Sequence, residues 1–416
     1  MINRHSRPLR GAYAYMLLFS LRLTEVYWVI YLRGKGLSFA AVGLMETAFH
    51  IASFSSEVPT GMLADRFGRK ISLFAGRVLS ACAAALTLYA RNWALLAASF
   101  AILAVSYTCH SGAFDALIYD SLPDDRKPEF TRLMGRLNSV YLLGTALAGG
   151  CAAFLVRFSL DWLYRGCIAV DAVAAVVALS LPEDLRGRTR VLPDGVDEPR
   201  GGLIADARAL YRSLRKRDLR NLLLLWGVSG ALGTSIFFYG QSILKDALLP
   251  LSMIGVVGTA SHLLAIPPSS NAYKIQRRFG QKTPLIAGSL MLTAIVVGIG
   301  LVPGSAGWLP RLVVVGLYMA VPIINETLYP LFSDAVNVRT DSANRAAVLS
   351  SGSMMFSLVM MVVFPLVGCV GDRMGLRWGI VVAALFTAVC LAPIALALVT
   401  ERPEQPSQSR RSARPA

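Results

Sequence analysis

Ionisable side chains inside long apolar stretches are the residues of this sequence best able to carry chemistry. The second such stretch contains Glu46, His50 and Glu57. Glu46 and His50 are four residues apart and Glu57 follows seven residues later, so a helix would place all three on one side. Carboxylates in a water-poor cavity can exchange protons near neutral pH, and histidine titrates there unaided. The pattern favours proton coupling or recognition of a cationic molecule; the alternative is structural pairing with Arg22 or Arg77.

Ionisable groups in the first, fourth and tenth apolar stretches are further functional candidates, because such groups are costly at membrane depth. Arg22 and Glu25, three residues apart in the first stretch, would share one helix face and could form a pair. Asp115 lies in the inner part of the fourth stretch. Glu326 is the deep acid of the tenth stretch, where polar neighbours and flanking prolines favour a cavity wall. We expect these four residues to join the three above in proton coupling or substrate contact.

Aromatic and polar residues near these charges are candidates for the wall of a lipophilic cavity. They are Tyr27, Tyr31, Phe238, Tyr239 and Asn325. The alternative is that the aromatic rings only pack between helices or anchor the spans at the membrane interface.

Histidine and cysteine show no clustering that would support a metal site or a catalytic centre. The four histidines are scattered, and the six cysteines lie in apolar stretches without C-x-x-C spacing. Catalysis needs a nucleophile, base or ligand set that converges on one place. The sequence therefore predicts no metal, no cofactor and no enzyme activity.

The apolar stretches are long enough to cross a membrane as helices. Hydrophobic residues make up 55% and charged residues 16% of the chain, whereas a soluble chain has about 25% charged residues. About 20 apolar residues span the bilayer core as a helix. Twelve stretches of that size are the predicted spans, near 11–32, 39–63, 71–90, 93–118, 134–157, 160–181, 219–244, 250–275, 284–302, 310–335, 346–370 and 378–399. The expected fold class is all-α integral membrane, with 12 transmembrane helices.

The distribution of positive charge predicts the orientation of these spans. With the N-terminus inside, about 30 of the 41 Lys and Arg residues fall on the cytoplasmic side. This asymmetry follows the positive-inside rule and places both termini in the cytoplasm. Contact with anionic lipid accounts for the net charge of +16, so no nucleic-acid partner is expected.

Hydrophilic segments divide the chain into four parts. Residues 1–181 are predicted to form an N-terminal six-helix bundle and residues 219–400 a C-terminal one. Residues 182–218 are the cytoplasmic central loop, in which 203–219 could form an amphipathic helix on the membrane surface. Residues 401–416 are expected to be a disordered basic tail.

The segment between the second and third spans carries the most informative motif, Gly61-Met-Leu-Ala-Asp65-Arg66-Phe67-Gly68-Arg69-Lys70. It resembles the G-x-L-a-D-R-x-G-R-K signature of the major facilitator superfamily (MFS). A shorter copy, from Arg277 to Lys282, follows at an offset of 212 residues. Parallel six-helix repeats are what a facilitator fold contains. The resemblance implies two pseudo-symmetric six-helix bundles.

The resemblance also implies a gating role for this motif. In the family, this loop is thought to lock the outward-facing state by bridging the two halves on the cytoplasmic side. Carried over to this chain, Asp65 and Arg69 form the gate, and Asp120 is the expected partner of Arg69. The alternative is that these charges only set the topology. The expected gating motif comprises Gly61, Asp65, Arg66, Gly68, Arg69, Lys70 and Asp120.

Other segments resemble a multidrug-efflux-like bacterial branch of the family. They are Tyr119–Leu122, Phe130–Arg136 and Asn344–Ser350. Drug–proton antiporters of the family usually carry an arginine four residues before a glycine in the fourth span. Here Thr108 precedes Gly112 at that spacing, and the glycine run of the fifth span lacks the antiporter proline. The antiporter assignment is therefore weaker than the family assignment.

The expected function is secondary active transport by alternating access, as proton-coupled export of a lipophilic or cationic small molecule. The sequence contains no P-loop, so an ion gradient or the gradient of the substrate itself would drive transport. The alternatives are uptake or export of a polar metabolite, by proton coupling or facilitated diffusion, and a transporter-like sensor without flux. The expected location is the inner (plasma) membrane. The expected partners are a small-molecule substrate, protons and membrane lipids, and the resemblance implies a monomer.

Overall fold

The computed structural model describes residues 7–111, 113–122, 130–181, 211, 215–303, 307–340 and 345–400. All regular secondary structure in this part of the chain is helical. The predicted tail at 401–416 lies outside the described residues, as do residues 203–210 and 212–214 of the predicted amphipathic helix and the side chain of Asp65.

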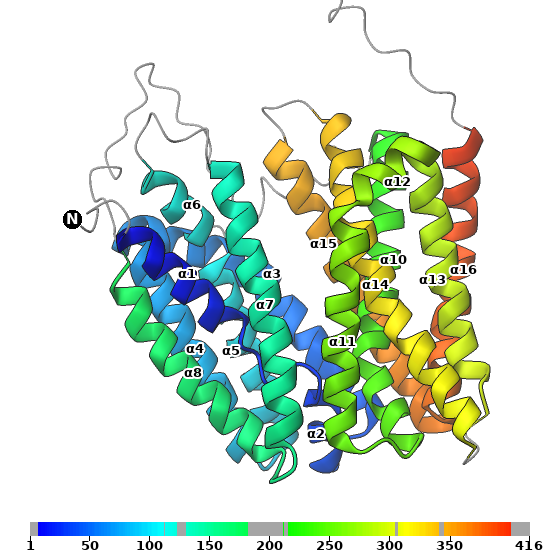
Figure 1. Ribbon diagram of the computed structural model, residues 1–416, viewed down its shortest axis with the longest axis horizontal. Coiled ribbons are helices and arrows are strands. Elements are labelled where there is room, and N and C mark those ends of the chain that lie inside the picture. Colours follow the sequence, from blue (N-terminus) through cyan, green and yellow to red (C-terminus); the bar gives the residue numbers. More distant parts are fainter. Residues whose placement is uncertain are drawn as a thin grey trace, which may run out of the picture.

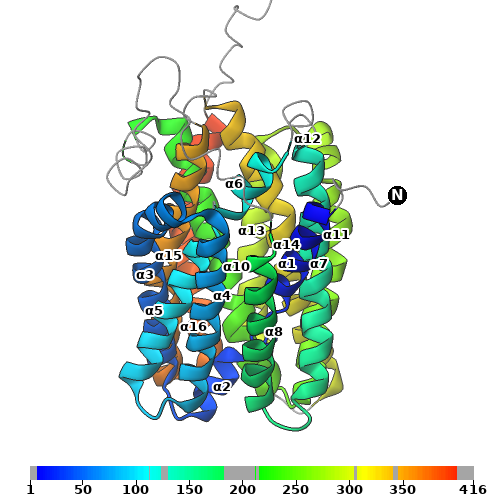
Figure 2. The same cartoon turned by 90° about the vertical axis from the view of Figure 1, so that its left-hand side faces the viewer.

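The helices form two groups that lie side by side (Figure 1). The first, called the N-group, contains α1 (Arg7–Ser20), α2 (Trp28–Gly34), α3 (Phe39–Phe67), α4 (Arg69–Tyr89), α5 (Trp93–His110), α6 (Ala113–Asp120), α7 (Phe130–Leu155) and α8 (Asp161–Leu179). The second, called the C-group, contains α10 (Arg217–Asp246), α11 (Leu251–Ser270), α12 (Ala272–Phe279), α13 (Lys282–Leu301), α14 (Trp308–Val338), α15 (Arg345–Met374) and α16 (Leu376–Thr400). The end of the molecule that holds α6 and α12 is called the termini end, and the end that holds α2 is called the far end (Figures 1 and 2).

Ten of the described helices are long and apolar enough to cross a membrane. The other two predicted spans differ for separate reasons. The stretch at 39–63 forms the 29-residue helix α3, whose polar residues, Glu46 and His50 among them, lower its hydropathy. The stretch at 11–32 is divided between α1 and α2.

The predicted first span is interrupted at residues 21–27, which form turns instead of helix. The hydroxyl of Ser20 donates to the carbonyl of Leu17 at the end of α1, a local bond that competes with helix continuation. The interruption exposes backbone groups, and one of them has a partner in the C-group. The Gln241 amide donates to the carbonyl of Glu25 at 3.0 Å. Irregular backbone at membrane depth is tolerated where protein or a cavity meets it.

Three helix pairs join the groups in the described part of the chain: α3 with α15, α7 with α11, and α2 with α10. Small residues allow the close approach toward the far end. A Cβ added at Gly43 would lie 2.7 Å from the backbone of Pro365, and one added at Gly255 would lie 3.2 Å from the carbonyl of Gly149. At Gly61, nearer the termini end of α3, an added Cβ would meet no described atom within 4 Å. The groups are therefore packed together toward the far end.

An aromatic cluster strengthens this packing. Trp28 of α2 lies 5.3 Å from the ring of Phe238 and 5.9 Å from that of Phe364, both in the C-group. The same indole contacts Phe100 of α5 at 5.3 Å. Aromatic rings bury large apolar areas, so this cluster makes one hydrophobic core continuous across the two groups.

Candidate functional site

The interruption of the first span places Arg22 among aromatic rings in the interior of the N-group. Its guanidinium lies 3.7 Å from the ring centre of Tyr107 and 4.7 Å from that of Phe19. The guanidinium of Arg77 lies 4.7 Å from the same Phe19 ring. Cation–π contacts of this kind are strongest where water is excluded. They hold a half-buried positive charge at the break between α1 and α2.

One acid from each helix group lies within electrostatic range of the other near this break. Glu326 of α14 lies within electrostatic range of Glu25, in the break, and of His262 on α11. Tyr141 of α7 lies within range of both carboxylates. Phe237 of α10 meets the His262 ring edge-on at 5.3 Å. We call Arg22, Glu25, Tyr141, His262 and Glu326 the central cluster. It combines charge with aromatic surface and draws on both groups.

The interior of the N-group holds a second polar arrangement. Arg77, which is 3% exposed, donates to Asp171 of α8 at 3.0 Å. The hydroxyl of Ser80 donates to the other oxygen of that carboxylate at 2.6 Å. His110 stacks on Phe19 with ring centres 3.7 Å apart. The Arg77–Asp171 pair joins α4 to α8 inside the N-group. Arg77 in the third predicted span and Asp171, in the middle of the sixth, were the signal that could have predicted it.

The three ionisable residues that the sequence singles out on α3 differ in burial. Glu46 and His50 are both buried, with 3.6 Å between Oε1 and Nε2. His50 Nδ1 lies 3.2 Å from the hydroxyl of Ser357 on α15, and the imidazole meets the ring of Phe356 edge-on. Glu57 is exposed, farther along α3 toward the termini end. Glu46 and His50 therefore belong to the contact between the two groups.

The predicted cavity-lining residues fall into two sets. Tyr27, Tyr31 and Tyr239 are buried, and each hydroxyl donates to an oxygen 2.7–3.1 Å away. Phe238 and Asn325 are half-buried. The three tyrosines hold helices together through directed bonds, whereas Phe238 and Asn325 keep part of their surface open.

The expected gating motif forms a tight connection between α3 and α4. Gly68 adopts φ 107°, a conformation that favours glycine, and is the only residue between the two helices. Arg69 forms an ion pair with Asp120 and donates to the carbonyl of Ala116, both on α6. The ion pair predicted from the sequence is present, and it lies within the N-group. Asp115 is exposed on the same short helix.

The remaining motif residues lie at the surface of the termini end. Arg66 is exposed, with its guanidinium 5.4 Å from the ring of Phe67. Lys70 is half-buried in the first turn of α4. Together with the open surroundings of Gly61, this leaves the end of α3 accessible from the termini end.

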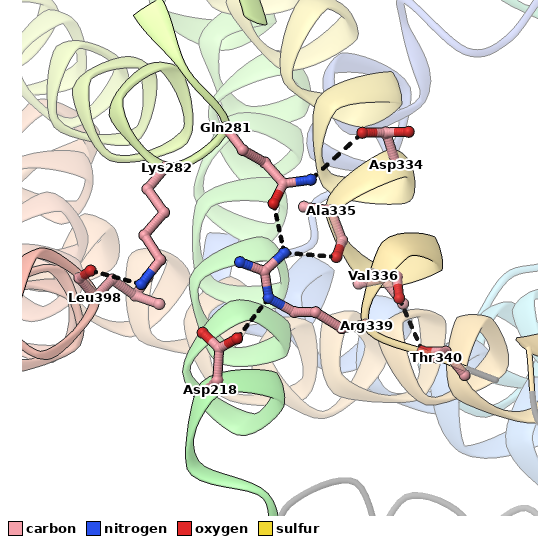
Figure 3. A network of polar contacts seen from close by, with 9 residues as sticks. All are labelled: Asp218, Gln281, Lys282, Asp334, Ala335, Val336, Arg339, Thr340 and Leu398. Carbon is pink, nitrogen blue, oxygen red and sulfur yellow. Dashed lines mark hydrogen bonds and ion pairs between the residues drawn. The ribbon is translucent and has the colours of Figure 1, made fainter. Parts of the chain in front are cut away.

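The second copy of the motif forms a different network (Figure 3). Arg339, at the end of α14, donates from Nε to Asp218 of α10 at 2.5 Å and from Nη1 to the Gln281 amide oxygen at 2.6 Å. The Gln281 amide nitrogen lies 3.4 Å from Asp334, and the Lys282 ammonium donates to the carbonyl of Leu398 at 3.0 Å. These bonds tie α10, α13, α14 and α16 together at the termini end of the C-group.

Sequence reasoning missed Asp218, Asp334 and Arg339. The 212-residue offset between the motif copies could have indicated the second of these, because it carries Asp120 to position 332, two residues before Asp334. Nothing local marks Arg339 or Asp218, because they are isolated charges at helix ends, where such charges are common.

The chemistry available to the central cluster is binding and proton exchange. Its carboxylates can take up protons or attract a cation, and its rings offer apolar and π surfaces. Within the described residues, no group of three or more His, Cys, Asp and Glu side chains is placed to hold a metal ion.

Comparisons with known proteins agree on family and fold. The family described as Major Facilitator Superfamily matches residues 14–340. The MFS-type transporter YxaM of Bacillus subtilis (strain 168) is 29% identical over 123 residues, 30% of this chain and 31% of that protein. The match thus spans less than a third of the length of that relative.

Solved transporter structures share the fold. The nucleoside transporter NupG superposes with a TM-score of 0.76 at 13% identity, over 96% of this chain and 100% of that chain. A bacterial homologue of the human lysosomal transporter Spinster gives 0.69 at 16% identity, over 96% and 98%. At these identities the likeness concerns the fold alone. Because the family match covers most of the sequence and the fold agrees with it, the chain belongs to the major facilitator superfamily of membrane transporters.

Proposed function

We propose that this transporter exports a lipophilic or cationic small molecule in exchange for protons, by alternating access between the N-group and the C-group. The observation that carries the proposal is the central cluster. Glu25 at the interrupted first span and Glu326 of α14 come from different groups and lie within electrostatic range of each other. A substrate bound there would contact both groups, as an alternating-access cycle requires.

The composition of the cluster supports a cationic substrate. Its two acids outnumber the single arginine, whose guanidinium already stacks on Tyr107 and Phe19. Tyr141 lies within electrostatic range of both acids, the ring of Phe237 contacts His262, and aromatic faces attract cations. A flat, apolar cation fits such surroundings better than a strongly hydrated one.

The same acids supply a mechanism for proton coupling. Two carboxylates close to each other repel, and either a proton or a cationic substrate would relieve that repulsion. A bound proton then disfavours binding of the cationic substrate, and a bound substrate disfavours the proton. Exchange of one for the other requires this competition. In this cycle, separation of α3 from α15 breaks the contact between His50, which lies beside Glu46, and Ser357.

The orientation follows from the positive-inside rule, with the termini end in the cytoplasm. The close packing at the far end then corresponds to an inward-facing state. In the cycle we propose, closure of the termini end brings the end of α3, with Asp65, against the start of α15. The Arg69–Asp120 pair holds α6 in place for that contact.

A second candidate function is transport of a polar metabolite, in either direction. The observation that favours it is Arg22, because a half-buried guanidinium at the centre of the molecule can also bind a carboxylate or phosphate group. A substrate of this kind would use Arg22 as its main contact, whereas the cation of the main proposal would use Glu326.

The test is accumulation of ethidium in cells with and without the protein, before and after collapse of the proton gradient. The proposal predicts lower accumulation with the protein, loss of that difference on collapse, and loss of it in Glu326→Gln. Asp334→Asn is the matched control, because it neutralises an exposed acid two turns farther along α14. Equal accumulation with well-inserted protein would contradict export of lipophilic cations, and Arg22→Gln would then be tested in metabolite profiles.

A further inference from the structure

The sequence around the end of α15 repeats the gating motif. Gly368-Cys-Val-Gly-Asp372-Arg-Met-Gly375 matches Gly61-Met-Leu-Ala-Asp65-Arg-Phe-Gly68 at both outer glycines and at the Asp-Arg pair, with an offset of 307 residues. This offset differs from the 212 residues that relate the two halves. The similarity therefore links two helices that are not equivalent in the internal repeat.

The backbone of the two segments is also alike. Asp65 lies two residues before the end of α3 and Asp372 two residues before the end of α15. Each helix is followed by a glycine with positive φ, 107° at Gly68 and 91° at Gly375. Because α3 and α15 run in opposite directions and pack on each other, the two segments lie at opposite ends of the molecule (Figure 1).

At the far end, Asp372 caps the start of α3. One carboxylate oxygen accepts from the backbone N–H of Phe39 and the other from that of Ala40, both at 2.8 Å. Ser38 accepts from the N–H of Ala41 at 3.1 Å. The first N–H groups of a helix have no partner within the helix and carry a partial positive charge. Here a carboxylate from the other helix group satisfies two of them.

The surroundings of Phe39 make this contact close and specific. Its carbonyl accepts from the hydroxyl of Tyr239 on α10, which also donates to the carbonyl of Phe364. A Cβ added at Gly368 would lie 2.3 Å from the Phe39 carbonyl oxygen, so only glycine fits there. The first residue of α3 is thus bound on both its N–H and its C=O by the C-group.

We propose that Asp372 is the latch of the far end, the counterpart of the Asp65 gate at the termini end. Asp372 of α15 holds the start of α3 when the far end is closed. Separation of the groups at the far end breaks both of its hydrogen bonds and exposes the N–H groups of Phe39 and Ala40 to water. The inference rests on the alternating-access cycle proposed above, and it assigns the far-end latch to Asp372.

The test is the distance between the groups at each end, measured by pulsed electron paramagnetic resonance on spin-labelled protein in nanodiscs. Labels would be attached in a cysteine-free background that still transports ethidium. Exposed positions suited to labelling are Arg91→Cys with Leu309→Cys at the far end and Arg132→Cys with Arg278→Cys at the termini end. Asp372→Asn is expected to shift the population about tenfold toward the state with a long far-end distance, a factor equivalent to about 1.4 kcal/mol.

Two matched variants separate the latch from a general loss of structure. Asp372→Glu keeps the carboxylate and is expected to retain most of the parent distribution. Asp246→Asn removes the same charge at the same end of the molecule, from α10, and is expected to leave the distribution unchanged. An Asp372→Asn distribution equal to that of Asp246→Asn would overturn the proposal. A parent protein that shows one fixed distance at both ends, with and without ethidium, would contradict the alternating-access cycle itself.

Discussion

The two copies of the short motif, after α3 and after α12, share a backbone turn and differ in what their side chains bind. Gly68 and Gly280 both adopt positive φ, at 107° and 79°. In the first copy, Arg69 pairs directly with an acid of α6. In the second copy, Gln281 takes that position and accepts a hydrogen bond from Arg339 instead. Both halves have the turn, but only the first half has the charge pattern.

The difference indicates a division of roles between the halves. The first copy has an acid, Asp65, at the end of α3, where the facing helix of the C-group starts. The second copy has Arg277 at the corresponding position, and that residue is exposed. An arginine cannot cap a helix N-terminus, because it only donates hydrogen bonds. The second copy therefore braces the C-group, and the first is suited to contact between groups.

The interiors of the two helix groups also differ in how their buried and half-buried charges are used. The N-group encloses the buried Arg77–Asp171 pair, which fixes α4 against α8. The C-group presents Glu326 to the central cluster, within range of His262. The Arg77–Asp171 pair joins two helices of the N-group, whereas Glu326 is the acid to which we assign substrate and proton binding in the proposed function.

We expect the largest effect when the Arg77–Asp171 pair of the N-group is broken. Arg77→Ala leaves Asp171 buried without its counter-ion, which costs about 3–5 kcal/mol. We expect a lower thermal unfolding midpoint in detergent, followed by tryptophan fluorescence. Arg66→Ala is the control, because its side chain is exposed. Equal midpoints for the two variants would show that the pair contributes little.

The next effect concerns transport instead of stability. We expect Glu25→Gln and Glu326→Gln each to reduce ethidium efflux at least tenfold, equivalent to about 1.4 kcal/mol, with unchanged unfolding midpoints. Because the two acids act on one site, the double variant should lose little more than either single variant. Fully additive losses would indicate that the acids act separately, and the central cluster would then not be one site.

A smaller effect is expected where the two motif copies differ, at Gln281. Gln281→Arg introduces the residue of the first copy and places a positive charge against Arg339. Since both groups are partly exposed, we expect a destabilisation of about 1 kcal/mol or less, from unfolding midpoints. Gln281→Met, which removes the acceptor without adding charge, is the control. A stabilised Gln281→Arg protein would mean that Asp334 accepts the new arginine and that the two copies are interchangeable.

The smallest effect concerns a single hydroxyl at the far end. Tyr239→Phe removes the bond to Phe39 across the groups, whereas Tyr318→Phe removes a buried bond to Phe237 inside the C-group. Each bond contributes about 0.5–1.5 kcal/mol. We expect Tyr239→Phe to lengthen the average far-end distance in the spin-label experiment, and Tyr318→Phe to leave it unchanged. The same shift in both variants would point to general loosening of the C-group.

The sequence was sufficient for the parts of this structure that depend on local pattern. Apolar length predicted the spans, and the segment from Gly61 to Lys70 predicted a tight turn and the Arg69–Asp120 pair. The length of an apolar stretch shows which residues must lie in lipid. It can be read from the sequence without knowing which helices pack beside it.

The parts that could not be predicted depend on partners distant in the sequence. The break at residues 21–27 lies within an apolar stretch, and its Glu25 carbonyl bonds to Gln241 of the other group. The capping of α3 by Asp372 joins residues 332 positions apart. Helical spacing placed Glu46, His50 and Glu57 on one face, but it could not show that two of them are buried against α15 and the third is exposed.

Proton movement driven by the substrate is the measurement that bears directly on exchange at the central cluster. Purified protein would be reconstituted in liposomes that contain a pH-sensitive dye, and ethidium would be added outside without an imposed gradient. We expect a change of internal pH that depends on ethidium, is abolished in Glu326→Gln and persists in Asp334→Asn. Ethidium transport without any proton movement in the wild-type protein would contradict the exchange of a cation for protons at the central cluster.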